Sequence, residues 1–280
     1  MDIILTGIAR SGTTLSCSLL NLLPQCVALH EPMRPSDLVG LRYPEEYLER
    51  VAAFFAEQRA SLLGAGTAVS GARDGSVPDN PFGSDPGSAG LRASTVKNEA
   101  VRFDKRLEPS FRLVVKHPNF FTATLEALLT RHPCYAIVRN PLAVLLSWNS
   151  IRAPVNEGRL PWGEAFDARL RADLAAEPDK VSRQLVILRW YFSRYAALLP
   201  RDHVIRYEDL VSSRGRALAA IDPAAATLDE ALESRNTSRL YDARVVREYA
   251  DRLLADDSLH RPFYDRSDVE RLRAAWSGER

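Results

Sequence analysis

The stretch that decides the fold is residues 3–14, which reads IILTGIARSGTT. Its apolar opening predicts a short buried strand, and Gly7 and Gly12 predict a tight turn after that strand. Leucines at positions 15, 19, 22 and 23 then recur at helical spacing. A helix that begins after such a turn presents unpaired backbone N–H groups and the positive end of its dipole. Both features suit a phosphate or sulfate group.

The spacing of Gly7 and Gly12 is that of a phosphate-binding P-loop, but Thr13 occupies the position of the P-loop lysine. Arg10 supplies a cation within the turn instead. Three hydroxyls in the turn can donate hydrogen bonds to anionic oxygens, namely Ser11, Thr13 and Thr14. We therefore expect a metal-free anion site rather than a site for a magnesium-bound nucleoside triphosphate. The alternative is an ordinary strand–turn–helix connection rich in small residues.

Composition limits the classes of partner. The chain has 280 residues, 46% of them hydrophobic, and a net charge of +1, so it can bury a full core and has no bulk attraction to nucleic acid or membrane. Its three cysteines have no metal-ligand spacing and suggest neither a zinc site nor a disulfide framework. The first predicted strand begins at the N-terminus and no apolar run is long enough to span a bilayer, so we expect a cytoplasmic protein without a signal peptide.

Short apolar runs alternate with helical patterns along the chain. Further strands are predicted at residues 26–29, 111–116, 134–138 and 203–207. Helices are predicted at residues 43–63, 121–129, 141–147 and 182–199. This alternation predicts an α/β fold with a mostly parallel central sheet and helices on both faces, as a single domain over residues 1–280. Glu31 follows the second strand, so we expect it to lie near the P-loop at the carboxyl edge of the sheet.

The stretch from Gly64 to Ser94 differs in composition from the rest of the chain. It is dense in Gly, Ser, Pro, Asp and Ala and poor in large apolar residues. Such composition predicts a long flexible loop. Two interpretations stay open, a lid over a substrate site and an inert insertion.

Four motifs in chain order resemble the family of sulfotransferases that use 3′-phosphoadenosine 5′-phosphosulfate (PAPS), of the bacterial small-molecule or carbohydrate type. GIARSGTT at residues 7–14 resembles the family's 5′-phosphosulfate loop. IVRNPLAVLLS at residues 137–147 resembles its 3′-phosphate motif, with Arg139 at a strand end and Ser147 eight residues later. VKHP at residues 115–118 resembles the strand end that carries a lysine, and RYEDL at residues 206–210 resembles a later strand of many members.

The resemblance implies PAPS as co-substrate and 3′-phosphoadenosine 5′-phosphate (PAP) as product, without a metal. The acceptor would be a hydroxyl of a small molecule or carbohydrate. The P-loop would then bind the phosphosulfate, and Arg139 and Ser147 the 3′-phosphate. Arg10, Lys116 and the loop amides would neutralise charge on the leaving phosphate. The oligomeric state is left open.

Transfer to a hydroxyl also needs a general base, for which Glu31 and His117 compete. His30-Glu31-Pro32 resembles a Glu-Pro pair that follows the second strand in several carbohydrate sulfotransferases. In cytosolic small-molecule sulfotransferases the base is a histidine shortly after the strand-end lysine, and His117 is directly adjacent to Lys116. We favour Glu31.

Two other functions compete with sulfuryl transfer. A P-loop kinase acting on a small molecule would need the loop lysine and an acidic magnesium ligand at a strand end. Thr13 replaces that lysine, and two of the strands end in the cations Lys116 and Arg139. A non-catalytic nucleotide-binding module would keep the anion sites and transfer nothing.

Overall fold

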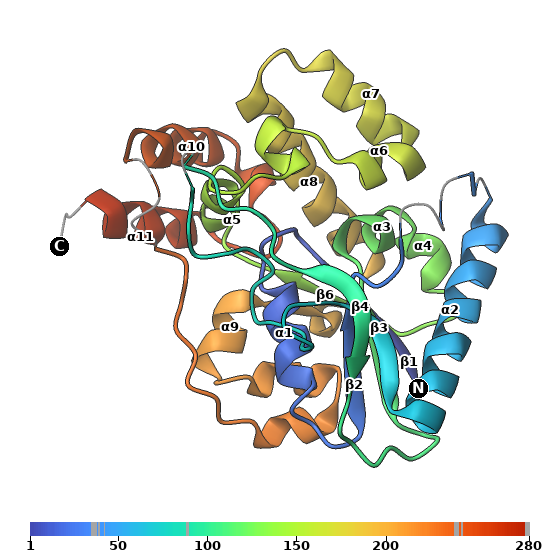
Figure 1. The fold of residues 1–280 in the computed structure, drawn as a ribbon. Helices are drawn as coiled ribbons and strands as arrows, with labels where there is room; N and C mark the ends of the chain where they lie inside the picture. Colours follow the sequence, from blue (N-terminus) through green and yellow to red (C-terminus); the bar gives the residue numbers. More distant parts are fainter. Residues whose placement is uncertain are drawn as a thin grey trace.

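A parallel sheet of five strands forms the centre of the protein in a computed structural model (Figure 1). The strand order is β2-β5-β1-β6-β7, and every neighbouring pair is parallel. The strands are β1 (Asp2–Gly7), β2 (Cys26–His30), β5 (Arg112–Lys116), β6 (Cys134–Val138) and β7 (Val204–Arg206). The structure describes residues 1–34, 38, 40–41, 43–87, 90–237, 241 and 243–277. The prediction of an α/β fold with a mostly parallel sheet is confirmed.

The central strand β1 is buried on both faces, as a continuous apolar run predicts for a covered parallel sheet. Alternate residues point to opposite faces, so Ile4 packs into one hydrophobic cluster and Ile3 and Leu5 into another. From β1 the chain passes through α1 to β2 on one side, while β6 pairs on the other side. The P-loop therefore lies where the connections diverge, which is where open α/β sheets bind ligands.

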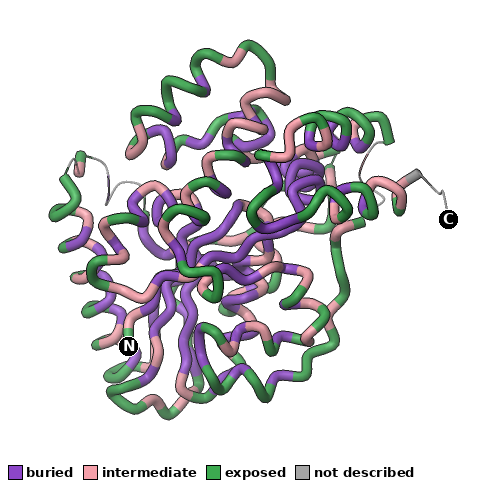
Figure 2. Tube along the Cα trace, turned by 180° about the vertical axis from the view of Figure 1, so that it is seen from behind, coloured by how far each residue is buried: buried purple, intermediate pink, exposed green. Residues whose placement is uncertain are grey.

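Helices cover both faces of the sheet (Figure 1). Those of six or more residues are α1 (Thr13–Leu20), α2 (Pro44–Ala65), α3 (Pro118–Ala123), α5 (Pro141–Trp148), α6 (Pro161–Phe166), α7 (Ala168–Ala176), α8 (Lys180–Leu198), α9 (Tyr207–Ser212), α10 (Ala243–Ala255) and α11 (Arg266–Ser277). A shorter helix, α4 (Leu125–Leu128), continues from α3. Figure 2 shows the strands as the most deeply buried part of the chain, with exposed outer turns on the surrounding helices.

The predicted loop from Gly64 to Ser94 is partly wrong. Its first residues complete α2, and Thr67–Ala72 form β3, which pairs antiparallel with β4 (Lys97–Arg102). This hairpin lies against the end of β2, where the backbone N–H of His30 donates to Ser70 Oγ at 2.9 Å. The described part of the remainder, residues 73–87 and 90–96, carries isolated bridges and reaches the sheet edge. Whether it moves as a lid stays a prediction.

The boundary between β7 and α9 also differs from the sequence pattern. Tyr207 was expected at the end of a strand but begins α9, whose first turn carries Glu208 and Asp209. Acidic side chains in a first turn stabilise a helix through its dipole.

In the part of the chain that the structure describes, no helix combines the length and apolar character needed to cross a lipid bilayer.

Candidate functional site

A cavity of about 820 Å³ opens at the carboxyl edge of the sheet. The P-loop, the ends of β2, β5 and β6, and the start of α1 form its floor and one wall. Residues from three segments outside the sheet add to the lining, and they lie within 79–82 and 92–96, within 151–162, and within 231–237 together with Tyr241. A size of this order suits a nucleotide together with a small second substrate.

The P-loop has the strained backbone that a phosphate-binding turn requires. Arg10 has a φ of 73° and Gly12 a φ of 94°, both left-handed. A Cβ at Gly12 would lie 2.7 Å from Cδ2 of Tyr207, so this position needs glycine for space as well as for conformation. The Ser11 hydroxyl donates to the Ile137 carbonyl at 2.7 Å and is fully buried. Ser11 therefore fastens the loop to β6 and does not line the cavity.

The start of α1 faces the cavity. Gly12 caps this helix without any side-chain hydrogen bond to its first turn, so the helix keeps the donor capacity of its opening amides. Thr13 and Thr14 both line the cavity. Thr14 Oγ1 lies 3.4 Å from Nζ of Lys116, which joins the helix start to the end of β5. Backbone amides, hydroxyls and a cation thus converge on one wall, as an anion site requires.

Lys116 forms the centre of a small polar cluster. Its side chain is only 3% exposed, and Nζ lies 2.6 Å from Glu31 Oε1 and 3.1 Å from His30 Nδ1. Parallel register explains the meeting, because His30 pairs with Lys116 across β2 and β5. Glu31 then turns out of the strand with a φ of 42°, and its backbone N–H donates to the Lys116 carbonyl at 2.8 Å.

The charges of this cluster depend on Lys116. Burial tends to raise the pKa of Glu31, but the attraction and hydrogen bond of Lys116 outweigh it, so the net pKa lies below the ordinary 4.5. Burial, and next the Lys116 ammonium, lower the pKa of His30 to about 3. At neutral pH Glu31 is therefore a carboxylate and His30 a neutral imidazole, both beside Lys116. An ammonium has no acceptor atom, so His30 Nδ1 is the acceptor of that contact.

His117 belongs to an aromatic cluster beside the cavity. Its Nε2 is 3.2 Å from the Met33 carbonyl, and its ring packs edge-on against Phe120, Phe121 and Trp162. Burial lowers the pKa of His117, although the charge of Glu31 opposes the shift. Among the described residues that line the cavity, Glu31 is present and His117 is not. The role of either residue as a base stays a prediction.

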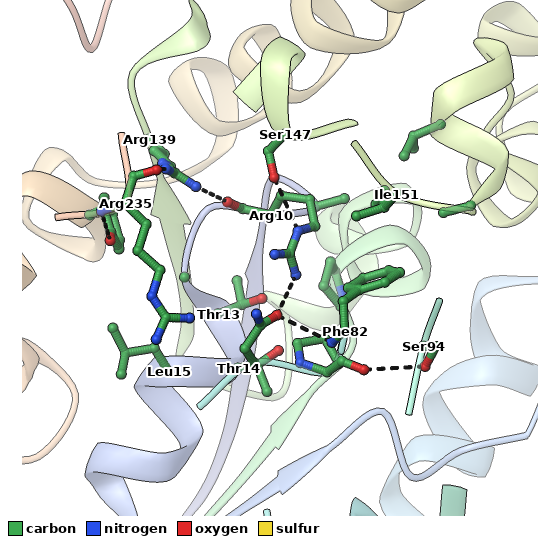
Figure 3. Close-up of a pocket in the computed structure, with 18 of the residues that line it drawn as sticks. Arg10, Thr13, Thr14, Leu15, Phe82, Ser94, Arg139, Ser147, Ile151 and Arg235 are labelled. Atoms are coloured by element: carbon green, nitrogen blue, oxygen red, sulfur yellow. Dashed lines mark hydrogen bonds between the residues drawn. The ribbon is translucent and has the colours of Figure 1, made fainter. Parts of the chain in front are cut away.

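Arg10 spans the middle of the cavity (Figure 3). Its Nε donates to Ser147 Oγ at 3.3 Å, and Nη1 donates to Asn80 Oδ1 at 3.1 Å. The guanidinium lies 4.7 Å from the centre of the Phe82 ring. Burial, and next the charges of Arg92 and Arg139, lower the pKa of Arg10 to about 9. Arg10 thereby joins the P-loop to the serine of the second motif.

Arg139 is held at the end of β6 by several partners. Its Nη1 donates to the Arg10 carbonyl at 3.0 Å, Nε donates to Asn236 Oδ1 at 2.7 Å, and Nη2 donates to the Arg235 carbonyl. The guanidinium stacks 4.6 Å from the centre of the Tyr207 ring. Asn140 caps α5 by accepting from the Leu142 N–H at 3.1 Å. Arg139, at the end of β6, and Ser147, in α5, therefore line the same cavity.

Sequence reasoning missed several polar residues of the cavity. Asp79, Asn80 and Arg92 come from the segment between β3 and β4, and Arg235 follows the last strand. Asp79 Oδ2 pairs with an Nη2 of Arg235 at 2.9 Å. These residues lie in stretches without strand or helix periodicity, so no pattern predicts where they fold. The only available signal was their polar character within a long irregular segment.

Solved bacterial sulfotransferases are similar to this chain over almost its whole length. They are the sulfotransferase domain of the Synechococcus PCC 7002 olefin synthase (17% identity; 99% of this chain and 94% of that chain covered; TM-score 0.33), STF9 from Mycobacterium avium (14%; 99% and 75%; 0.37) and STF1 from Mycobacterium tuberculosis H37Rv (14%; 99% and 76%; 0.37). No family model and no curated protein matches the chain. Similarity at this level assigns no role to any residue.

Proposed function

We propose that this chain transfers a sulfuryl group from PAPS to a hydroxyl of a small-molecule or carbohydrate acceptor. The observation that carries the proposal is the pairing of two anion-binding sets within one cavity. The first set is the P-loop, the start of α1 and Lys116, and the second is Arg139 with Ser147. A donor with a 5′-phosphosulfate and a separate 3′-phosphate needs two such sets.

The donor set fits this chemistry without a bound metal. Of the cavity cations, Arg10 and Arg139 form no ion pair with a described carboxylate, and their recorded partners are hydroxyl, amide and carbonyl oxygens. Buried arginines without a counter-ion favour an anionic ligand. The backbone amides at the start of α1 add uncharged donors to the same site.

The donor supplies the sulfuryl group, and residues of the chain position and neutralise it. The acceptor oxygen bonds to sulfur while the bond from sulfur to the 5′-phosphate oxygen breaks. The electron pair of the broken bond stays on PAP, where Arg10, Lys116 and the loop amides offset the added charge. The acceptor proton passes to Glu31, which is ionised and lines the cavity.

Lys116 serves both halves of this scheme. Its ion pair with Glu31 keeps the carboxylate ionised but also makes it a weak proton acceptor. As negative charge grows on the leaving phosphate, Lys116 is attracted toward the phosphate and its ion pair with Glu31 becomes weaker. The pKa of Glu31 then rises at the step that needs a base.

Calorimetry and a transfer assay test the proposal. PAP should bind without magnesium and more tightly than ATP with magnesium, because the 3′-phosphate finds Arg139 and Ser147. Labelled PAPS offered with a library of hydroxylated metabolites should label at least one acceptor. Preference for ATP with magnesium would favour the kinase, whereas PAP binding without any transfer would favour the non-catalytic module.

We also propose that residues 73–96 cover the acceptor side of the cavity. Asn80 and Phe82 contact Arg10 of the P-loop, and Asp79 pairs with Arg235, whose carbonyl accepts from Arg139, so the segment lies next to both anion sets. If it moves as a lid, PAP should change the rate at which a protease cleaves within residues 73–96. An unchanged rate would favour a fixed wall.

A further inference from the structure

Arg92 belongs to the segment between β3 and β4, yet its backbone is fastened to the loop that follows α5. The Arg92 N–H donates to the Ser150 carbonyl at 3.1 Å, and the Arg152 N–H donates to the Arg92 carbonyl at 2.9 Å. The two hydrogen bonds form a parallel bridge around Ile151. Arg92 is therefore positioned by the loop that follows α5, the helix that carries Ser147.

Its side chain points toward Ser147 through a short chain of hydrogen bonds. Nη2 of Arg92 donates to Ser150 Oγ at 2.8 Å, and that hydroxyl donates to the Ser147 carbonyl at 2.9 Å. The Ser147 hydroxyl accepts from Arg10 Nε at 3.3 Å. Arg10 and Arg92 thus approach Ser147 along two routes, and both arginines line the cavity.

The charge of Arg92 is not balanced within the described part of the chain. None of its recorded contacts is with a carboxylate, and its Nε is buried without a hydrogen-bond partner among the described residues. The cations Arg139 and Arg235 lie near Arg92. Of these two, Arg235 pairs with Asp79, and Arg139 has no ion pair with a carboxylate in the described part of the chain. A buried donor and clustered positive charge are unfavourable unless an anion joins them.

Resting on the proposed function, we infer that Arg92 binds the 3′-phosphate of the donor together with Arg139 and Ser147. The planar guanidinium keeps Nη2 on Ser150 and leaves Nη1 to donate to a phosphate oxygen. The segment between β3 and β4 then completes the donor site as well as the acceptor side. Its arginine makes recognition of the 3′-phosphate depend on how this segment is seated.

The test compares two nucleotides that differ only by the 3′-phosphate, PAP and adenosine 5′-phosphate. We expect Arg92→Gln to weaken PAP binding by about 10- to 100-fold, the range for a lost hydrogen bond to a charged group. Binding of adenosine 5′-phosphate should change less than about twofold, since it lacks the group that Arg92 contacts. Arg92→Lys keeps the charge without the planar fork, so its loss for PAP should be intermediate.

Arg73→Gln is the matched control, because Arg73 lies in the same segment and bonds the exposed Thr95 away from the cavity. Calorimetry measures both affinities, and thermal melting confirms that each variant is folded. If Arg92→Gln fails to fold, Arg92→Lys carries the test. Equal losses for both nucleotides, or no loss for PAP, would overturn the role of Arg92. A wild-type protein that binds no PAP would instead overturn the proposed function.

Discussion

Replacing Glu31 by glutamine separates its proposed role as base from its role as the partner of Lys116. In the wild-type protein Lys116 Nζ lies 2.6 Å from Glu31 Oε1. The amide oxygen of glutamine can still accept a hydrogen bond from Lys116, but the amide cannot take up a proton. Losing one partner of a fully buried ion pair costs about 3–5 kcal/mol. The Glu31 side chain is 44% exposed and the hydrogen bond remains, so we expect a loss of about 1–2 kcal/mol in unfolding free energy.

The effect on turnover should be much larger than the effect on folding. Removing a general base lowers kcat by about 10²- to 10⁴-fold. PAP affinity should stay nearly unchanged, because Glu31 is not a donor in either anion-binding set. The assay is transfer from labelled PAPS to an acceptor found in the metabolite screen, with calorimetry for PAP. Glu49→Gln is a suitable control, since Glu49 pairs with Arg131 at 2.6 Å on the surface, away from the cavity.

A second variant decides between the two candidate bases. His117→Asn should cost less in kcat than Glu31→Gln, because His117 packs among aromatic rings outside the cavity. Near-normal turnover in Glu31→Gln with a large loss in His117→Asn would refute the reasoning and reverse the assignment. Since the pKa of Glu31 is depressed, its charge stabilises the fold above about pH 4.5 and this contribution is lost as pH falls further. The stability gap between wild type and Glu31→Gln should therefore shrink only in acid.

Three further outcomes follow from the same geometry. Arg139→Ala should weaken PAP binding by about 2–3 kcal/mol in calorimetry, the range for a hydrogen bond to a charged group, and equal binding of adenosine 5′-phosphosulfate and PAPS would contradict the reason given. Transfer should survive EDTA, whereas loss of activity that magnesium restores would point to a kinase. The pKa of His30 is lowered to about 3 in the folded protein, so between about pH 6.5 and pH 3 the unfolded state binds one proton more than the folded state. The free energy of unfolding should therefore decrease below about pH 6.5, by up to about 1.4 kcal/mol per pH unit. His30→Gln should flatten that slope in denaturant titrations, and an unchanged slope would assign it to other groups.

Much of the sheet could be predicted because its strands are short, apolar and buried on both faces. The prediction for Cys134–Val138 matches β6 at both ends. The prediction of one helix at residues 121–129 was less accurate, since α3 begins at Pro118 and the helix breaks at Thr124. The Thr124 hydroxyl donates to the Phe120 carbonyl at 2.9 Å, a local bond that competes with regular helix geometry. A side-chain hydrogen bond of this kind does not change the spacing of apolar residues, so the break between α3 and α4 could not be predicted from the sequence pattern.

The site could be predicted as far as strand ends determine it. Glu31, Lys116 and Arg139 line one cavity because parallel strands all end at one edge, and predicting this needs no knowledge of loops. Asp79, Asn80 and Arg92 could not be placed this way, since their position depends on the β3–β4 hairpin and on bonds to the loop after α5.

Within the P-loop, residue type alone also proved insufficient, as Ser11 and Arg10 show. Both carry donors suited to an anion, and both lie in the same tight turn. The Arg10 side chain extends from a left-handed backbone into the middle of the cavity, while the Ser11 hydroxyl is directed to the Ile137 carbonyl of β6. One donor is thereby available to a ligand and the other holds the loop to the sheet. The loop's glycine spacing predicts that a donor-rich turn forms, and the backbone torsions determine which of its side chains can bind an anion.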